Sequence, residues 1–394
     1  MLTIDKIYEA HRVLSSVVRR TPLTAAPALG DTIYIKNENL QLTGSFKLRG
    51  AYNKLSHLSD EEKARGVVAC SAGNHAQGVA LSATKMGIKS VICMPAGAPI
   101  AKVEATRGYG AEVVLVPGVY DDAAREAERL AREEGYTFAH PFNDEYVMAG
   151  QGTIALEILE QLPDVEQIIV PIGGGGLISG IAVAVKALKP QCKVIGVQAA
   201  GAPSMYNSVK NRRIEELPGV ATIADGIAVK RPGDLTYECC CRYVDDIVTV
   251  TEDEIASAIL ALMESQKTLS EGAGATTVAA YQFGKVDTSL KTVCVVSGGN
   301  IDVTTLSRVI TKGLMKSGRL AEITTKVVDK PGMLIHLLQV VGATGANIKE
   351  IDHKHENVSS EVNSCVVSMV LETRNQAHVA EIMKALTDAG YVLL

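Results

Sequence analysis

Short apolar runs, each followed by a stretch with helical spacing, dominate the chain between residues 66 and 297. Such runs occur at 66–70, 90–95, 111–117, 167–172, 193–198, 246–251 and 292–297. Runs that are apolar at nearly every position are typical of strands buried on both faces of a parallel sheet. Because a helical stretch follows each of them, we predict an α/β fold, and the length allows two doubly wound sheets.

The pattern changes near Gly318. The following segments read as strand, helix, strand, strand, helix and strand, at 319–329, 330–345, 347–356, 362–373, 375–390 and 391–394. This order is that of a ferredoxin-like α+β domain. We therefore expect a body over residues 1–318 and a small appended domain over residues 319–394, which would regulate the body or help assemble an oligomer.

Composition excludes several classes of protein. The 394 residues are too many for one compact core, and the net charge of −5 comes without a basic run for nucleic acid. The eight cysteines form no CxxC pair or Cys/His cluster, and the N-terminus has no signal-peptide pattern, so we expect a reducing, cytoplasmic location. The uncharged segment 168–185 contains Pro171 and four consecutive glycines, which indicate strand, turn and helix instead of a membrane span.

Three glycine-rich turns follow predicted strands, where doubly wound sheets bind their ligands. They are "CSAGNHAQG" at 70–78, "GGGG" at 173–176 and "SGGN" at 297–300. Consecutive glycines let backbone N–H groups approach an anion at a helix N-terminus, which indicates phosphate binding, although tight packing would also use them. A dinucleotide is less consistent, because the pattern is not GxGxxG and no acidic residue ends the strand at 193–198.

Polar groups gather at the same turns. Ser71, Asn74 and His75 could bind a carboxylate or a phenolate, or Ser71 and Asn74 could simply cap a helix. Lys47 lies in "TGSFKLRGA" among small and apolar residues, so it is a candidate nucleophile unless it is an ordinary solvated lysine. A lysine for an aldehyde together with a phosphate cradle is what a pyridoxal phosphate (PLP) enzyme requires.

Four motifs in this order, "TGSFKLRGA", "SAGNHAQG", "GGGGLISG" and "SGGN", resemble those of fold-type II PLP enzymes, specifically the threonine and serine dehydratases. The resemblance covers about residues 1–316 and implies a small domain, roughly 43–143, inserted in a larger one. The tail, with "DKPGML" and "GANI", is similar to an ACT domain, an amino-acid-sensing unit. The resemblance therefore implies two doubly wound sheet domains followed by a ferredoxin-like ACT domain.

The resemblance also implies roles for individual residues. Lys47 would hold the cofactor aldehyde and take the substrate Cα proton, with Phe46 beside the cofactor ring. Asn74 would bind the phenolate oxygen, and Ser297 would face the pyridine nitrogen. Glu271 in "SEGAGA" would contact the substrate amino or hydroxyl group, or be a solvated helix flank. The remaining assignments are a phosphate cradle from the amides of Gly173, Gly174, Gly175, Gly176 and Leu177, substrate carboxylate donors at Ser71, Gly73, Asn74 and His75, and regulatory positions at Pro331, Gly332 and Asn347.

A neutral hydroxyl at the pyridine nitrogen favours elimination over transamination. The implied reaction converts L-threonine to 2-oxobutanoate and ammonia, with L-serine to pyruvate as a side activity. Racemising relatives use a second acid/base on the face opposite the lysine, and a serine in this turn resembles that group. Ala72 has no proton to give there, so racemisation is not expected. The tail implies a homo-oligomer, a dimer or tetramer, and an effector such as isoleucine, valine or a nucleotide. Asp225 in "TIADG" resembles a cation-binding loop of some relatives, but it could equally be a turn residue, and the metal stays open.

Several alternatives remain at this level. Serine dehydratase, threonine synthase and sulfhydrylase share the fold, although no extra basic cluster for phosphohomoserine is present. From a different class, a non-catalytic amino-acid sensor would predict a lost lysine or a broken glycine cradle, and a nicotinamide dehydrogenase lacks support for the reasons given above. Isoleucine biosynthesis and threonine catabolism would use the same catalytic residues.

Overall fold

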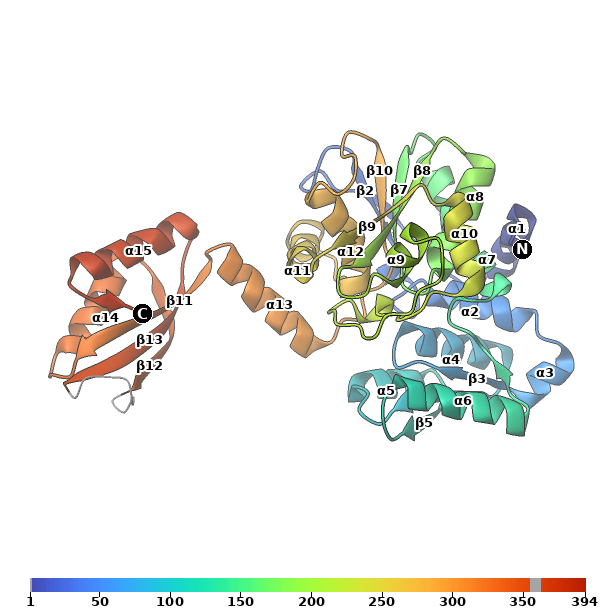
Figure 1. Cartoon of the computed structure of the whole chain (residues 1–394), viewed down its shortest axis with the longest axis horizontal. Coiled ribbons are helices and arrows are strands. Elements are labelled where there is room, and N and C mark those ends of the chain that lie inside the picture. Colours follow the sequence, from blue (N-terminus) through green and yellow to red (C-terminus); the bar gives the residue numbers. More distant parts are fainter. Residues whose placement is uncertain (1, 355–362) are drawn as a thin grey trace. The chain divides into compact units, whose positions relative to one another are not determined.

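The computed structural model describes residues 2–354 and 363–394, and it divides into two compact units (Figure 1). The first unit extends to Asp302 and the second begins at Val303. The expected boundary near residue 318 lies at the end of helix α13 (Val303–Lys316), which groups with the second unit. The predicted strand at 347–356 and the start of the one at 362–373 fall partly outside the described residues.

The first unit contains a large sheet of six strands in the order β1-β2-β10-β7-β8-β9. All neighbours pair in parallel except β1, which is antiparallel to β2. The strands are β1 (Leu23–Ala25), β2 (Ile33–Asn37), β7 (Gln167–Pro171), β8 (Lys193–Ala199), β9 (Asp246–Val250) and β10 (Thr292–Val296).

A second, wholly parallel sheet has the order β5-β4-β3-β6 and lies between β2 and β7 in the sequence. Its strands are β3 (Val67–Cys70), β4 (Ser90–Pro95), β5 (Glu112–Val116) and β6 (Thr137–Phe138). Alternate residues of β3 and β4 pack against different helices, because Ala69 and Ile92 join a core with α4 whereas Val68 and Val91 join one with α6. The predicted α/β class with two sheets is confirmed, one sheet being wholly parallel and the other parallel except for β1.

Helices cover the large sheet as well. Strands β7 and β10 are buried at every position, and apolar residues of α7 and α8 share a core with them. The helices of this unit are α1 (Ile4–Leu14), α2 (Lys47–Ser56), α3 (Asp60–Arg65), α4 (Asn74–Met86), α5 (Ile100–Gly108), α6 (Tyr120–Glu134), α7 (Glu145–Gln161), α8 (Gly176–Leu188), α9 (Ser204–Lys210), α10 (Asp234–Tyr243), α11 (Glu252–Ala261) and α12 (Gly272–Gln282), with short turns η1 (Glu38–Leu40), η2 (Asp225–Ile227) and η3 (Leu262–Gln266).

The second unit contains the predicted ferredoxin-like arrangement after α13. Its sheet has the order β12-β13-β11-β14, with every neighbouring pair antiparallel. One face of the sheet packs against α14 and α15, through residues such as Leu337 and Ile382. The elements are β11 (Leu320–Val328), α14 (Met333–Ala343), β12 (Asn347–Lys354), β13 (Ser364–Glu372), α15 (Gln376–Asp388) and β14 (Val392–Leu393).

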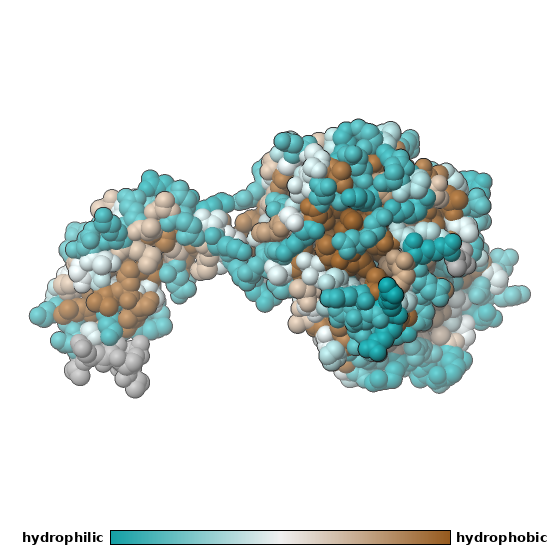
Figure 2. Space-filling model, turned by 45° about the horizontal axis from the view of Figure 1, so that its top comes forward, coloured by the Kyte–Doolittle hydropathy of each residue, from teal (hydrophilic) through white to brown (hydrophobic). Residues whose placement is uncertain are grey.

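The uncharged segment 168–185 forms β7, the glycine turn and most of α8, as predicted. Among the described residues, no helix has the length and apolar character needed to cross a membrane. In the view of Figure 2, hydrophilic residues cover most of the surface and hydrophobic residues form limited patches between them.

Candidate active site

The lysine segment and the turn after β10 are bound directly to each other. The Phe46 N–H donates to the Ser297 carbonyl at 3.0 Å, and the Gly299 N–H donates to the Gly44 carbonyl at 2.9 Å. Gly44 has φ of +70°, and a Cβ on it would lie 2.4 Å from Asn300 Oδ1. A side chain at position 44 would therefore be both strained and blocked, which explains the glycine.

A row of hydrogen bonds extends from this contact. Asn300 Nδ2 donates to Asn74 Oδ1 at 2.8 Å, Asn74 Nδ2 donates to Glu271 Oε1 at 2.7 Å, and the Glu271 N–H donates to the Gly298 carbonyl at 3.0 Å. Asn74 is thus not a helix cap, since Gly73 holds that position in α4. Sequence reasoning passed over Asn300, although it belongs to the quoted "SGGN" turn.

Lys47 begins α2, and its amine lies inside the protein. Its Nζ donates to the Pro141 carbonyl at 2.9 Å and lies 5.4 Å from the centroid of the Phe46 ring. Burial lowers the pKa of Lys47 to about 8, and the nearby Glu271 carboxylate opposes that shift. The alternative of a solvated surface lysine is excluded, and an amine that loses its proton near neutral pH can act as a base or nucleophile.

The segment after β6 supplies groups that the sequence analysis missed. His75 Nε2 lies 2.8 Å from the Ala139 carbonyl, which can only accept a hydrogen bond, so this nitrogen carries the proton. His140 Nδ1 lies 2.8 Å from the Asn143 amide nitrogen and accepts its N–H. Burial lowers the pKa to about 3 for His75 and to about 4 for His140, and the positive charge of Lys47 adds to both shifts. Both imidazoles are therefore neutral at pH 7.

This segment could have been found in the sequence, because "AHPFND" follows a strand of the small sheet at its carboxyl end. It also reaches the glycine turn. A Cβ on Gly174 would lie 2.4 Å from the Phe142 ring, and one on Gly176 would lie 2.9 Å from Phe142 Cβ. Pro141 and Phe142 thus connect the amine of Lys47 with the glycine turn.

The glycine turn between β7 and α8 presents unused donors. The amides of residues 173–177 find no hydrogen-bond acceptor within the described parts of the chain, and all but Gly173 are buried. Gly175 has φ of +97°, which lets the turn lead into the helix. Buried N–H groups at a helix N-terminus without a protein acceptor suit a buried anion. The residues present therefore fit a phosphate group.

Ser45 supports the same interpretation. It is fully buried directly before Phe46, and its hydroxyl has no hydrogen-bond partner among the described residues. Ser297 directly follows the neighbouring strand β10 and is 2 % exposed. A group bound beside Phe46 and Ser297 could take up this hydroxyl, although six other buried polar atoms of the described chain also have no partner.

Glu271 is buried, with 4 % exposure, so it is not the solvated helix flank that the sequence left open. Burial raises the pKa of Glu271 to about 7, and the negative charge of Asp225 adds to this, while the bond from Asn74 opposes it. Asp225 itself pairs with Lys102 at 2.5 Å. No group of three or more His, Cys, Asp or Glu side chains that could hold a metal ion occurs among the described residues.

The "SAGNH" turn leads into α4. The Gly73 N–H donates to Ser71 Oγ at 3.1 Å, and Ala72 packs beside the core of the small sheet. Because the first N–H groups of a helix have no partner within it, the amides of Asn74 and His75 are directed to whatever lies beyond the N-terminus. Ser71, Gly73, Asn74 and His75 are thus all at one helix start.

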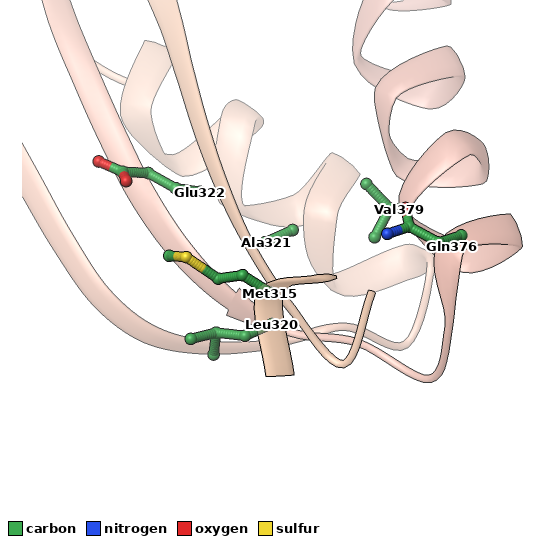
Figure 3. A pocket seen from close by; sticks show the side chains of 6 residues that line it. All are labelled: Met315, Leu320, Ala321, Glu322, Gln376 and Val379. Atoms are coloured by element: carbon green, nitrogen blue, oxygen red, sulfur yellow. The ribbon is translucent and has the colours of Figure 1, made fainter. Parts of the chain in front are cut away.

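In the second unit, Pro331, Gly332 and Asn347 are exposed. Gly332 has φ of +87° at the start of α14, and Asn347 Nδ2 donates to Glu372 Oε2 at 2.8 Å. A hollow of about 300 Å³ lies elsewhere in this unit (Figure 3), between Gln376 and Val379 of α15 and residues of β11 and the end of α13. None of the three predicted regulatory residues lines it; its lining is Met315, Leu320, Ala321, Glu322, Gln376 and Val379.

A buried amine whose pKa is lowered to about 8 and a cradle of buried amides without acceptors in the described chain fit a phosphate-bearing aldehyde. The class of protein is therefore an α/β enzyme that uses pyridoxal phosphate.

The chain belongs to the family of pyridoxal-phosphate dependent enzymes, since the sequence model of that family matches residues 14–298. A curated L-threonine ammonia-lyase from Thermotoga maritima is 52% identical over 99% of this chain and 98% of its own length. Among solved structures, the processed form of threonine deaminase isoform 2 from Solanum lycopersicum is 37% identical with a TM-score of 0.74, covering 79% of this chain and 90% of that one. Maize serine racemase has the same identity and TM-score, covering 80% of this chain and 98% of its own.

Proposed function

We propose that the chain is a threonine ammonia-lyase, which converts L-threonine to 2-oxobutanoate and ammonia, with L-serine to pyruvate as a side activity. The observation that carries the proposal is the buried Lys47 amine, whose pKa of about 8 makes it a base near neutral pH. The 52% identical relative named L-threonine ammonia-lyase, matched from end to end, supports the choice of substrate.

Each site residue has a task in this proposal. Bound pyridoxal phosphate supplies an electron sink for negative charge at the substrate Cα. Lys47 would hold the cofactor aldehyde and later, as a free amine, take the Cα proton at Nζ. Phe46 would lie beside the cofactor ring, and Ser297 would offer a neutral hydroxyl to the pyridine nitrogen. The phosphate would be held by the amides of Gly173, Gly174, Gly175, Gly176 and Leu177, whose N–H groups have no acceptor in the described chain.

The substrate carboxylate binds at the start of α4, to donors of Ser71, Gly73, Asn74 and His75. For His75 the donor is the main-chain N–H, because its ring is neutral and already bonded to the Ala139 carbonyl. Asn74 keeps a second N–H for the phenolate oxygen, since its amide nitrogen uses one N–H on Glu271.

Glu271 contacts the substrate amino or hydroxyl group. A carboxyl with a pKa of about 7 can hold a proton for the departing hydroxide near neutral pH. Loss of the Cα proton to Lys47 and of hydroxide from Cβ leaves an enamine, which water hydrolyses to the oxo acid and ammonia once it is released.

The test is release of oxo acids from L-threonine and L-serine by the purified protein with pyridoxal phosphate. We expect 2-oxobutanoate from L-threonine and less pyruvate from L-serine. If neither oxo acid forms, the proposal is wrong, and the activities of the synthases and sulfhydrylases of the same fold would be the next to test.

Racemisation is the activity to exclude, because a serine racemase is among the similar structures. Ala72 has no proton to give at the turn where a serine would be needed on the face opposite Lys47. We expect no D-serine from L-serine. Formation of D-serine at a rate comparable to pyruvate would show that another residue supplies this proton.

We further propose a cytoplasmic homo-oligomer, a dimer or tetramer, whose second unit binds a regulatory amino acid. Isoleucine and valine are the first candidates, a nucleotide the second, and Pro331, Gly332 and Asn347 are the proposed contacts. The ferredoxin-like topology of the second unit supports this. Threonine kinetics and light scattering, measured with and without each compound, test this proposal. If no compound changes the kinetics or the oligomeric state, the second unit has only a structural role.

A further inference from the structure

Next to the first turn of α2 lies a buried group of four charged side chains, Lys36, Glu38, Arg49 and Glu157, which we call the charge cluster. Their side chains are between 0% and 5% exposed. Arg49 forms a fork with Glu38, through Nε to Oε2 and Nη2 to Oε1, both at 2.8 Å, and its Nη1 donates to Glu157 Oε1 at 2.6 Å. Two positive and two negative groups therefore balance in the protein interior.

Further bonds hold the cluster together and link it to neighbouring groups. Lys36 Nζ donates to Glu157 Oε2 at 2.5 Å and to the Thr21 carbonyl at 2.8 Å. Thr21 Oγ1 donates to Glu38 Oε1 at 2.5 Å, and Arg49 Nη1 reaches Thr153 Oγ1 at 3.3 Å. The cluster thus ties the start of α2 to β2, to η1 and to α7.

Arg49 and Lys47 belong to the same helical turn but are directed to different sides of it. Two residues along an α-helix correspond to a rotation of about 200°. Lys47 extends to Pro141, whereas Arg49 extends to Glu38 and Glu157. Any rotation or shift of this turn that moved Arg49 would move the Lys47 amine with it.

Close packing of α2 on α7 adds to this constraint. A Cβ on Gly150 would lie 2.5 Å from the Arg49 carbonyl oxygen, and one on Gly50 would lie 2.8 Å from the Val147 carbonyl oxygen. The Gly50 N–H donates to Gln151 Oε1 at 3.2 Å. The two helices therefore have little freedom to slide where they cross.

We propose that Arg49 is a positioning residue for Lys47, in that its forked pair with Glu38 and its bond to Glu157 orient the first turn of α2. The inference rests on the proposed function, in which Lys47 is the base. Apolar side chains could hold two elements together as well as buried charges do, but they define direction less sharply than a bidentate guanidinium–carboxylate pair. A base displaced by 1 Å from its proton loses about 100-fold in rate.

The test compares Arg49→Lys with the parent and with Ile158→Val, all loaded with pyridoxal phosphate. Lysine keeps the charge but not the fork, whereas Ile158 is a fully buried neighbour of Glu157 on α7 that loses only packing. We expect Arg49→Lys to lower kcat for L-threonine about 10- to 100-fold, with KM changed less than about threefold, and to weaken the visible circular dichroism of the bound cofactor. Ile158→Val should change neither kcat nor the spectrum.

A folded Arg49→Lys protein with kcat and visible spectrum like the parent would overturn the proposal. So would an equal loss of kcat in Ile158→Val, because ordinary destabilisation would then explain the effect. Should Arg49→Lys not fold, Thr153→Val decides the question through the 3.3 Å contact, with kcat reduced about threefold expected and an unchanged kcat contradicting it. If the parent itself releases no oxo acid, the proposed function fails, and the visible spectrum, recorded without substrate, still tests the positioning.

Discussion

Two groups of buried charges in the first unit have opposite electrostatic behaviour. In the charge cluster, burial alone would raise the pKa of Glu157, yet the charges of Arg49 and Lys36 lower it below its usual range. At the candidate active site, burial raises the pKa of Glu271 to about 7 and lowers that of Lys47 to about 8. Lys36 is an exception within the cluster, since burial lowers its pKa even with carboxylates beside it.

The difference lies in the number of partners. Glu157 accepts bonds from Arg49 and Lys36, whereas Glu271 accepts one from the neutral amide of Asn74 and forms no ion pair in the described chain. Burial favours the neutral form of a group unless an opposite charge is in contact with it. Between the two carboxyl groups, therefore, contact with two cations keeps Glu157 charged, while Glu271, without a cation in contact, is able to exchange a proton near neutral pH.

The largest expected effect is that of Lys47→Ala. We expect oxo-acid release from L-threonine to fall at least about 1,000-fold, because the proposed base is removed. Urea unfolding should show no loss of stability, since the variant no longer buries an amine with few partners. Activity above a tenth of the parent's would remove Lys47 from the mechanism.

Glu157→Gln breaks the charge cluster instead. Arg49 and Lys36 would then share a neutral amide in a buried site, and we expect the free energy of unfolding to fall by about 3–5 kcal/mol. The midpoint of urea unfolding measures this. A loss below about 1 kcal/mol would show that the charge cluster does not depend on complete pairing for its stability.

The pH dependence of stability should reflect the raised pKa of Glu271, which forms no ion pair in the described chain. Its pKa in the folded protein, about 7, lies above the ordinary value of 4.5, so the folded state binds more protons between these pH values. The free energy of unfolding of the cofactor-free protein should therefore decrease by about 3 kcal/mol from pH 4.5 to 7 through this group. Glu271→Gln should remove that part of the slope. An identical slope in the variant would show that another group, and not Glu271, causes this pH dependence.

The smallest effect is expected for an exposed pair on the same helix as Glu157. Glu160 meets Arg20 at 3.2 Å, and both side chains are more than half exposed. Glu160→Gln should change the free energy of unfolding by less than about 0.5 kcal/mol, because water and salt screen such pairs. A loss as large as that of Glu157→Gln would mean that the position on α7, and not burial, determines how much the free energy of unfolding falls.

Much of the fold could be predicted from the sequence. Buried parallel strands have a recognisable composition, so the runs at 66–70, 90–95 and 292–297 appear as β3, β4 and β10. The ferredoxin-like order after Gly318 was also readable, because helix and strand differ in their periodicity. The assignment of α13 to the second unit could not be predicted, since the pattern of an amphipathic helix does not indicate which unit it packs with.

Local sequence by itself pointed to Lys47, the glycine turn and the polar turns, because each lies in a short motif beside a strand end. Only the tertiary structure decided that Asn74 bonds to Glu271 and Asn300, that His75 uses its ring on Ala139, and that Pro141 accepts from Lys47. These contacts join residues from 64 to 226 positions apart. The same holds for Arg49, whose proposed role depends on Glu38 and Glu157. Whether a buried charged group has an oppositely charged partner depends on which residues the fold brings into contact, and no local sequence pattern shows this.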